Sequence, residues 1–175
     1  MEHRIQNLKF KIQNSGMSLL ELLLYIAILS GLMVIVANTF VALSKGRGQA
    51  EARSEVNSAI RFAAERIKQD VKNASAISTP TLGTPANTLN LTVSDIPVVY
   101  DVLGGVLRRT ENSVVATTTG NAVFVSQPTF TRLENYNDVL KATTTAIQTA
   151  MTFSYNASST DWTYSDTLRT TAAFR

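Results

Sequence analysis

The chain begins with a polar segment and then becomes apolar without interruption. From Leu22 to Ser44 no residue carries a charged side chain. As a helix, this stretch is about 34 Å long, enough to cross a hydrocarbon core of about 30 Å. A run that is apolar on every side needs a large protein around it to be a buried core helix, and a chain of 175 residues does not supply one. The pattern predicts a membrane-spanning helix over residues 17–44.

A second pattern covers residues 45–78, where apolar residues recur at spacings of three and four. This periodicity is typical of one face of an amphipathic helix that packs against a partner. Two charged pairs four residues apart, Arg61 with Glu65 and Arg66 with Asp70, are expected to be solvated ion pairs on its more polar faces. The apolar stripe consists of Val56, Ile60, Ala64, Ile67, Val71 and Ala74.

The period changes from 3.6 to 2 after residue 78, where Pro80, Gly83 and Pro85 are expected to end the helix. Alternating apolar and polar positions predict strands, and Gly104-Gly105 between two such stretches predicts a hairpin. The expected strands are 89–93, 98–103, 106–109, 114–115, 122–125, 147–155 and 168–174. The fold class is therefore α+β, with a long N-terminal helix packed on an antiparallel sheet and a β-rich head over residues 79–175.

Glycines also occur where the predicted span ends. In Lys45-Gly46-Arg47-Gly48, each glycine costs roughly 1 kcal/mol in a helix interior, so we expect a flexible joint at the membrane exit. Basic residues near the span do not decide its orientation. Within reach of the membrane there are three on each side, namely Arg4, Lys9 and Lys11 before the span and Lys45, Arg47 and Arg53 after it.

The amino-acid composition excludes several kinds of catalytic and metal-binding site. The chain has no Cys, which excludes disulfides, thiol nucleophiles and thiolate zinc sites. Its single histidine, His3, lies at the N-terminus, so a histidine-based triad is not expected. We expect no catalytic residue, no cofactor and no resident metal. The net charge of +3 is small for a nucleic-acid-binding protein.

One cluster of acidic and aromatic residues has two interpretations, a calcium site and a pair of solvated carboxylates. Asp161 and Asp166 flank Trp162 and Tyr164, and a pair of carboxylates in a turn is compatible with calcium. Calcium prefers six to eight oxygen ligands, however, and two aspartates in water are the simpler interpretation.

Residues 1–16 form a basic leader, in which Arg4, Lys9 and Lys11 outweigh Glu2. A basic segment before an apolar run is typical of a targeting signal. An ordinary secretory signal peptide fits poorly, because its apolar core is about 7–15 residues long and ends at a small-residue cleavage site. Here the small residue, Gly16, stands before the apolar run instead.

Glu21 is the one carboxylate at the start of the span. A charged side chain costs about 2.5–3.5 kcal/mol at the centre of a membrane helix and less near the interface, and such residues are candidates for function. The alternative is an interfacial glutamate favoured by the helix dipole. The local sequence is Gly16-Met17-Ser18-Leu19-Leu20-Glu21, followed by LLLYIAILSGLMVIV.

This combination of basic leader, glycine, five-residue spacing, glutamate and long apolar helix resembles the N-terminal signal of type IV prepilins and type II secretion pseudopilins. The resemblance covers roughly residues 9–43. It implies that a prepilin peptidase cleaves after Gly16, that Met17 is then N-methylated, and that Glu21 pairs with the Met17 amine of a neighbouring subunit as helices stack in a filament. Such a pairing would set the register, since an unpaired buried charge costs several kcal/mol.

The resemblance also implies partners and a location. The partners are the prepilin peptidase, other pilins or pseudopilins, the inner-membrane assembly platform and membrane lipid, with nucleic acid involved only through DNA uptake. The chain would sit in a bacterial or archaeal cytoplasmic membrane as a single-pass protein, N-terminus inside and globular domain outside, before it enters a pilus or pseudopilus.

Several departures from the family pattern favour a minor pilin or pseudopilin. Met17 stands where most members have Phe, no disulfide loop can form, and the apolar helix lacks the proline of many major pilins. The four prolines are Pro80, Pro85, Pro97 and Pro128. A weaker resemblance to J-type pseudopilins and related minor pilins rests on Phe62, Arg66-Ile67, Asp70-Val71, Tyr100, Gly104-Gly105 and Leu107-Arg108-Arg109. Without it, Arg108-Arg109 is simply an exposed strand end.

The sequence thus predicts four segments: a cleaved leader (1–16), a transmembrane and assembly helix (17–44), an amphipathic helix of the globular domain (45–78) and a β-rich head (79–175). The leading hypothesis is a structural filament subunit. The alternative is an uncleaved single-pass membrane-anchored binding protein with an extracytoplasmic β domain. An anchored enzyme fits least, because the processed chain would have neither His nor Cys and no spacing brings a convincing catalytic pair together.

Overall fold

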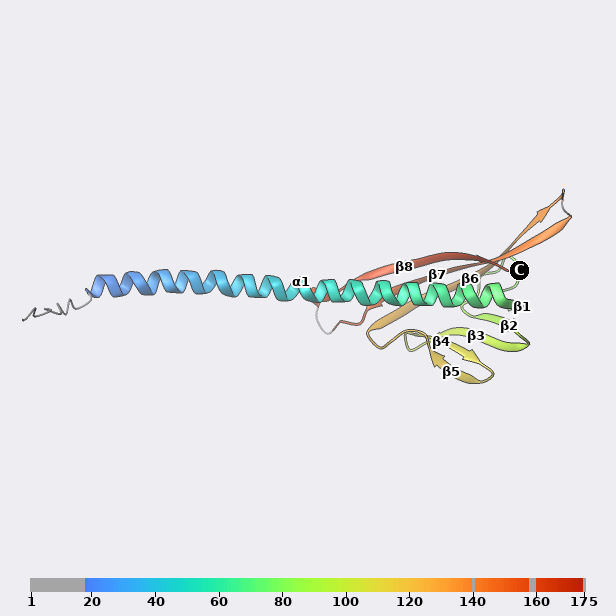
Figure 1. The fold of residues 1–175 in the computed structure, drawn as a ribbon, viewed down its shortest axis with the longest axis horizontal. Coiled ribbons are helices and arrows are strands. Elements are labelled where there is room, and N and C mark those ends of the chain that lie inside the picture. Colours follow the sequence, from blue (N-terminus) through green and yellow to red (C-terminus); the bar gives the residue numbers. More distant parts are fainter. Residues whose placement is uncertain (1–17, 140, 158–159, 175) are drawn as a thin grey trace, which may run out of the picture. The chain divides into compact units, whose positions relative to one another are not determined.

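The structure, a computed structural model, describes residues 18–139, 141–157 and 160–174. Within these residues, one long helix, α1 (Leu19–Asn73), is followed by strands and one short 3-10 helix (Figure 1). The chain divides into two compact units, Met1–Leu43 and Ser44–Arg175, so that α1 contributes residues to both. The α+β class and the long apolar N-terminal helix are confirmed.

The second unit contains two antiparallel sheets, one with the order β1-β2-β3-β4-β5 and one with the order β6-β7-β8. Hydrogen-bonded neighbours are also neighbours in the chain. The elements are β1 (Ala74–Thr79), β2 (Leu89–Val93), β3 (Ile96–Leu103), β4 (Val106–Glu111), β5 (Val114–Thr117), β6 (Val123–Asn137), β7 (Ala142–Tyr155), η1 (Thr160–Trp162) and β8 (Ser165–Ala173).

Two-residue turns join β2 to β3, β3 to β4 and β4 to β5. In each turn both residues have positive φ, the conformation that matches the twist of a tight hairpin. The turns are Ser94-Asp95 (φ 50° and 64°), Gly104-Gly105 (60° and 79°) and Asn112-Ser113 (46° and 68°). The glycine hairpin confirms the prediction. The other two were missed because neither contains glycine.

The predicted end of the helix at residue 78 is wrong. α1 ends at Asn73, and β1 (Ala74–Thr79) pairs with β2 instead of forming a last helical turn. In this register Ala74 lies opposite Val93 and Ile77 opposite Leu91, so the apolar side chains of β1 join the sheet. The spacing that placed Ala74 on the helical stripe is also compatible with the first residue of a strand.

β6 is much longer than the predicted stretch 122–125. It continues to Asn137 through a register shift between Ser126 and Thr129, and it pairs with β7 along its length. The sequence did not predict this length because polar residues and Pro128 interrupt the alternation of apolar and polar positions that is typical of a strand. Ala146 is the first β7 residue with a partner in β8, and the Thr145 carbonyl still accepts a hydrogen bond from the Phe174 N–H at 2.8 Å. Before these residues, at 142–144, β7 pairs with β6 alone, and the two strands form a projecting hairpin (Figure 1).

The core of the second unit forms where α1 meets both sheets. Val56, Ile67 and Val71 of the predicted stripe are fully buried, and Ile60 and Ala64 pack at its border. The sheets contribute alternate residues, as expected from strand geometry. The largest side chains with under 2% exposure are Tyr100, Phe130, Phe153, Ile67, Leu89, Leu107, Ile147 and Met151. The amphipathic character of this part of α1 is confirmed.

The two glycines expected to form a flexible joint lie within α1. Gly46 has open space around it, whereas Gly48 is buried and a Cβ there would collide with the indole ring of Trp162. Gly48 therefore serves packing, because only a residue without a side chain lets the indole approach the helix so closely.

Candidate functional site

The first unit consists, in its described part, of residues 18–43, all of them exposed. The large apolar side chains range from 47% exposed at Leu22 to 77% at Leu19. Within the described chain, α1 is the one helix long and apolar enough to cross a membrane. An apolar surface of this size needs lipid or other helices to cover it. This surface indicates a single-pass membrane anchor near the N-terminus.

The hydroxyl groups on this helix bond to the helix itself. Ser30 Oγ donates to the carbonyls of Ile26 and Ala27, and Thr39 Oγ1 donates to the Ile35 carbonyl at 2.8 Å. In lipid, polar groups must find partners within the protein. These side chains meet that requirement within one helix.

Glu21 lies in the first turn of α1. Ser18, a residue type favoured at the N-cap, accepts the first helical hydrogen bond from the Leu22 N–H at 3.1 Å. One turn later, the Tyr25 hydroxyl donates to Glu21 Oε1 at 3.0 Å. No Lys or Arg among the described residues forms an ion pair with Glu21. Gly16 and Met17, the predicted cleavage and methylation positions, lie outside the described residues, so the pairing of Glu21 with Met17 stays a prediction.

A buried polar network links α1 to the five-stranded sheet. Asp70 Oδ2 accepts a hydrogen bond from the Tyr100 hydroxyl at 2.6 Å and another from Arg109 Nε at 2.6 Å. Arg109 Nη1 also donates to the Glu111 carboxylate. Asp70 is 4% exposed and Arg109 8% exposed. Tyr100 and Arg109 are direct partners in the β3–β4 register, so neighbouring strands present both donors to one carboxylate of the helix.

This network corrects two predictions. Asp70 does not form a solvated pair with Arg66, and Arg109 is not part of an exposed strand end. The strand period of two places Arg109 on the buried face with Leu107. Arg108 points to the other face and pairs with Asp101, its partner across the strands.

The predicted pair of Arg61 with Glu65 is also wrong. Glu65 lies 4.0 Å from Lys68 Nζ instead.

The network has a definite protonation state. Burial, reinforced by the hydrogen bond to Asp70, raises the pKa of the Tyr100 phenol far above its usual range. Burial lowers the pKa of Arg109, but its hydrogen bonds to Asp70 and Glu111 outweigh this effect and raise the pKa overall. At neutral pH, Tyr100 is therefore a neutral donor and Arg109 a cation, and together they hold α1 against β3 and β4.

The acidic and aromatic cluster of the sequence lies against the second unit's part of α1. Asp161 Oδ2 is 3.2 Å from Lys45 Nζ, and the guanidinium of Arg53 lies 5.6 Å from the centre of the Tyr164 ring. Asp166 accepts a hydrogen bond from the Thr167 N–H at 2.7 Å. In the described part of the chain, no three His, Cys, Asp or Glu side chains come together as metal ligands. The two aspartates thus make separate contacts within the protein.

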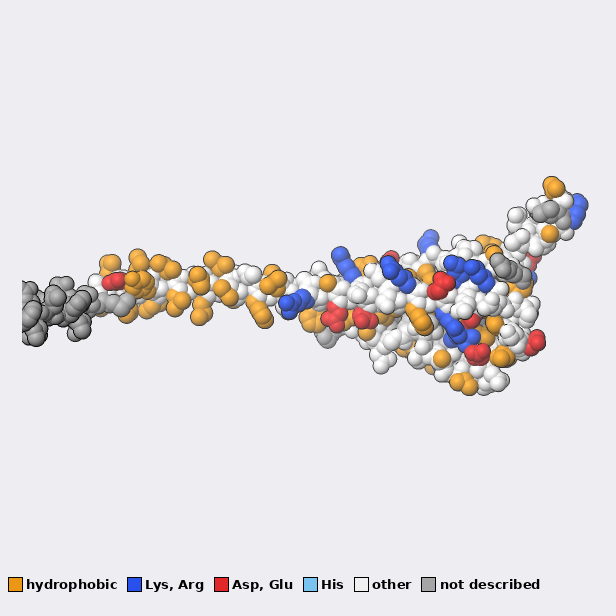
Figure 2. Space-filling model, in the orientation of Figure 1, with side chains coloured by type: hydrophobic (Ala, Val, Ile, Leu, Met, Phe, Trp, Pro, Cys, Tyr) orange, Lys and Arg blue, Asp and Glu red, His pale blue; other side chains and the backbone are white. Residues whose placement is uncertain are grey.

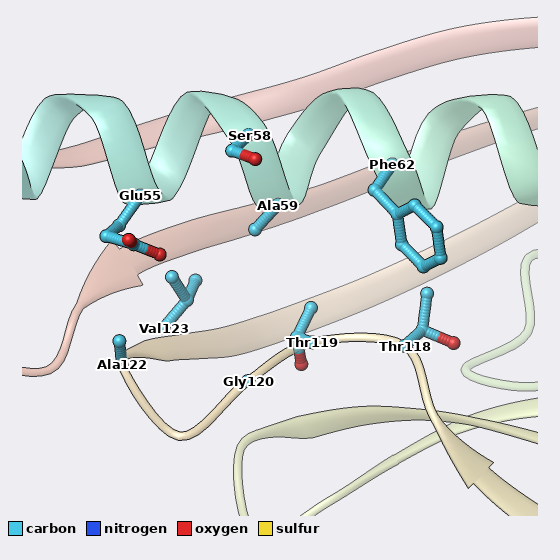
Figure 3. Close-up of a pocket in the computed structure, with 9 residues that line it drawn as sticks. All are labelled: Glu55, Ser58, Ala59, Phe62, Thr118, Thr119, Gly120, Ala122 and Val123. Atoms are coloured by element: carbon cyan, nitrogen blue, oxygen red, sulfur yellow. The ribbon is translucent and has the colours of Figure 1, made fainter.

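A groove of about 240 Å³ lies beside α1. Glu55 and Phe62 project from the helix toward the segment that joins β5 to β6 (Figure 3). Phe62 is 59% exposed, and Glu55 forms no ion pair with another described residue. Sequence reasoning missed this feature, although Phe62 stands outside the apolar stripe and was a signal for it. The lining residues are Glu55, Ser58, Ala59, Phe62, Thr118, Thr119, Gly120, Ala122 and Val123.

Comparisons of the chain with protein-family models, with curated proteins and with solved structures found no match.

Proposed function

We propose that this chain is a minor pilin or pseudopilin, a structural subunit that assembles through its N-terminal helix into a type IV pilus or a type II secretion pseudopilus. In this proposal the leader 1–16 is removed by a prepilin peptidase, Met17 is N-methylated, and the head faces outward from the cytoplasmic membrane. The inner-membrane assembly platform and other pilins or pseudopilins are the partners.

The observation that supports this proposal best is Glu21 at the start of the apolar part of α1, whose residues up to 43 are all exposed. Tyr25 offers the carboxylate one hydrogen bond, but no described cation offers a charge. If this helix is surrounded by other helices, Glu21 loses water, and an uncompensated buried charge costs several kcal/mol. The amine of a neighbouring Met17, freed by cleavage after Gly16, would remove that cost. A neighbour in the wrong register would leave the charge of Glu21 uncompensated.

The intact mass and N-terminal residue of the protein test this proposal, measured on membranes from a host with an active prepilin peptidase. We expect a chain that starts at N-methylated Met17. A chain that still starts at Met1, in a host shown to process known prepilins, would refute the proposal. It would favour the uncleaved membrane-anchored binding protein, for which Gly16 and Glu21 have no special role.

A further inference from the structure

Two charged surfaces of opposite sign lie side by side on α1 within the second unit. The first, the acidic patch, consists of Glu51, Glu55 and Phe62 with the adjoining groove. The second, the basic stripe, consists of Arg61, Lys68 and Lys72. At about 100° per residue, the two surfaces are roughly 100° apart around the helix axis. Figure 2 shows blue Lys and Arg side chains spaced along this part of α1, with red carboxylates beside its beginning.

The two carboxylates of the acidic patch have no ion-pair partner in the part of the chain that the structure describes. Glu51 and Glu55 are exposed, lie one helical turn apart and form no ion pair with another described residue. Like charges at this spacing destabilise a helix by a few tenths of a kcal/mol. The adjacent Phe62 ring is also exposed and borders the groove. Two carboxylates beside an aromatic groove suit a cation that carries a long apolar stem, such as lysine.

The basic stripe has the matching chemistry. Arg61 and Lys72 form no ion pair within the described part of the chain, and Lys68 reaches only Glu65 at 4.0 Å. Lys68 and Lys72 are four residues apart, as are Glu51 and Glu55. Both pairs therefore repeat at about 6 Å along a helix axis.

We propose that the acidic patch of one copy binds the basic stripe of a second copy of this chain that lies parallel to it. A shift of 17 residues, about 26 Å, sets Glu51 against Lys68 and Glu55 against Lys72. The stem of Lys72 then lies in the groove. A shift of ten residues, which would set Glu51 against Arg61, also opposes Glu55 to Glu65 and is disfavoured.

This inference rests on the proposed function, because filament subunits lie parallel. The pairing of Glu21 with Met17 implies a shift of only about 6 Å between two neighbours, so the patches join a different pair of neighbours in the same filament. The two surfaces differ from each other, and such a contact between copies does not close on itself but continues. The filament should therefore contain more than one copy of this chain.

Engineered disulfides test the contact, and the absence of natural Cys makes every thiol an introduced one. The full chain carries Glu55→Cys and Lys72→Cys together and is oxidised in membranes and in sheared filaments. Within one copy the two positions are about 26 Å apart on the helix, far beyond the roughly 7 Å that a disulfide can bridge. A disulfide must therefore join two copies, and we expect a ladder of dimers, trimers and larger species.

Two controls accompany this variant. The matched pair Asn57→Cys with Lys72→Cys places the first thiol on the opposite flank of the helix and should give no ladder. Adding Glu51→Lys to the Glu55→Cys, Lys72→Cys chain should lower the yield of cross-linked oligomers about fivefold, and Lys68→Glu should restore it. Raising the salt concentration should also lower the yield.

The outcomes separate this inference from the proposed function. A ladder of multiples of the chain's own mass, dependent on the charges at 51 and 68, supports the contact. Recovery of the chain in sheared filaments without a ladder overturns the contact and leaves the filament proposal standing. A processed chain that never enters filaments overturns both. A cross-linked product of another mass overturns the second copy as the occupant.

Discussion

Asp70→Asn tests whether the buried network holds the helix to the sheet. The substitution keeps the size of the side chain but removes the charge that Arg109 faces at 2.6 Å. Tyr100 and Arg109 both donate to the same carboxylate oxygen, and the amide oxygen of Asn can take its place and accept both hydrogen bonds. What the substitution removes is therefore the negative charge opposite the buried guanidinium of Arg109.

The cost follows from burial. Removing one partner of a buried ion pair typically costs about 3–5 kcal/mol. Arg109 retains Glu111 as a second carboxylate, so we expect the lower end, about 3 kcal/mol. For a chain of this size each kcal/mol lowers Tm by about 2–4 °C, which predicts a loss on the order of 10 °C.

Thermal unfolding of the full chain in detergent, followed by the fluorescence of the single Trp162, measures this loss. The matched control is Asp101→Asn, because Asp101 pairs with the adjacent Arg108 but both side chains are about a quarter exposed, at 26% and 25%. This variant should cost at most about 1 kcal/mol. Equal losses of Tm in the two variants would refute the argument from burial. Replacing Asp70, Tyr100 and Arg109 together by Leu, Phe and Met should recover most of the loss.

Three further predictions concern other parts of the chain. Glu21→Gln should leave membrane insertion and cleavage intact but abolish recovery in sheared filaments, and normal recovery would contradict the role proposed for the charge. Gly46→Ala should stabilise the helix by up to about 1 kcal/mol in thermal unfolding, whereas Gly48→Ala should destabilise by about 1–3 kcal/mol and shift the Trp162 emission, because the new methyl group meets the indole. Above about pH 10 the phenol of Tyr100 ionises in the unfolded chain but stays protonated in the folded one, where burial raises its pKa, so stability falls as pH rises. Tyr100→Phe, about 1 kcal/mol less stable at neutral pH, should show a shallower alkaline decline in urea unfolding, and an equally steep decline would rule this cause out.

Periodicity predicted the elements that bury one clear face. The stripe on α1, the β3–β4 hairpin and the alternating β7 were all accessible from the sequence, because each has an apolar face with a fixed spacing. The length of β6 was not, since its polar residues obtain their hydrogen bonds from β7 whatever their side chains. The sequence pattern around Ala74 is also compatible with both a helix and a strand, and the pairing with β2 determines that this residue belongs to a strand.

The polar network lay beyond sequence reasoning for a different reason. Asp70 and Arg109 are 39 residues apart, and either could pair with a nearer opposite charge. Their partnership depends on the order in which the strands meet the helix. Arg108 and Arg109 illustrate this, because two identical neighbouring residues differ in burial only through the face of β4 that each occupies. Gly48 was misinterpreted in the same way, since the indole that excludes a side chain there comes from the far end of the chain.

The strand order has a consequence for how the head acquires its structure. Each hydrogen-bonded ladder joins strands that follow one another in the chain, and the helix precedes them all. Closing such short loops costs little entropy, and contacts that are local in sequence favour rapid folding. A chain that emerges from its N-terminal anchor can therefore complete one ladder before the next strand arrives. Each newly exposed strand edge on the growing side of the five-stranded sheet is then covered by the strand that comes next, which limits the time that this edge is available for pairing with another molecule.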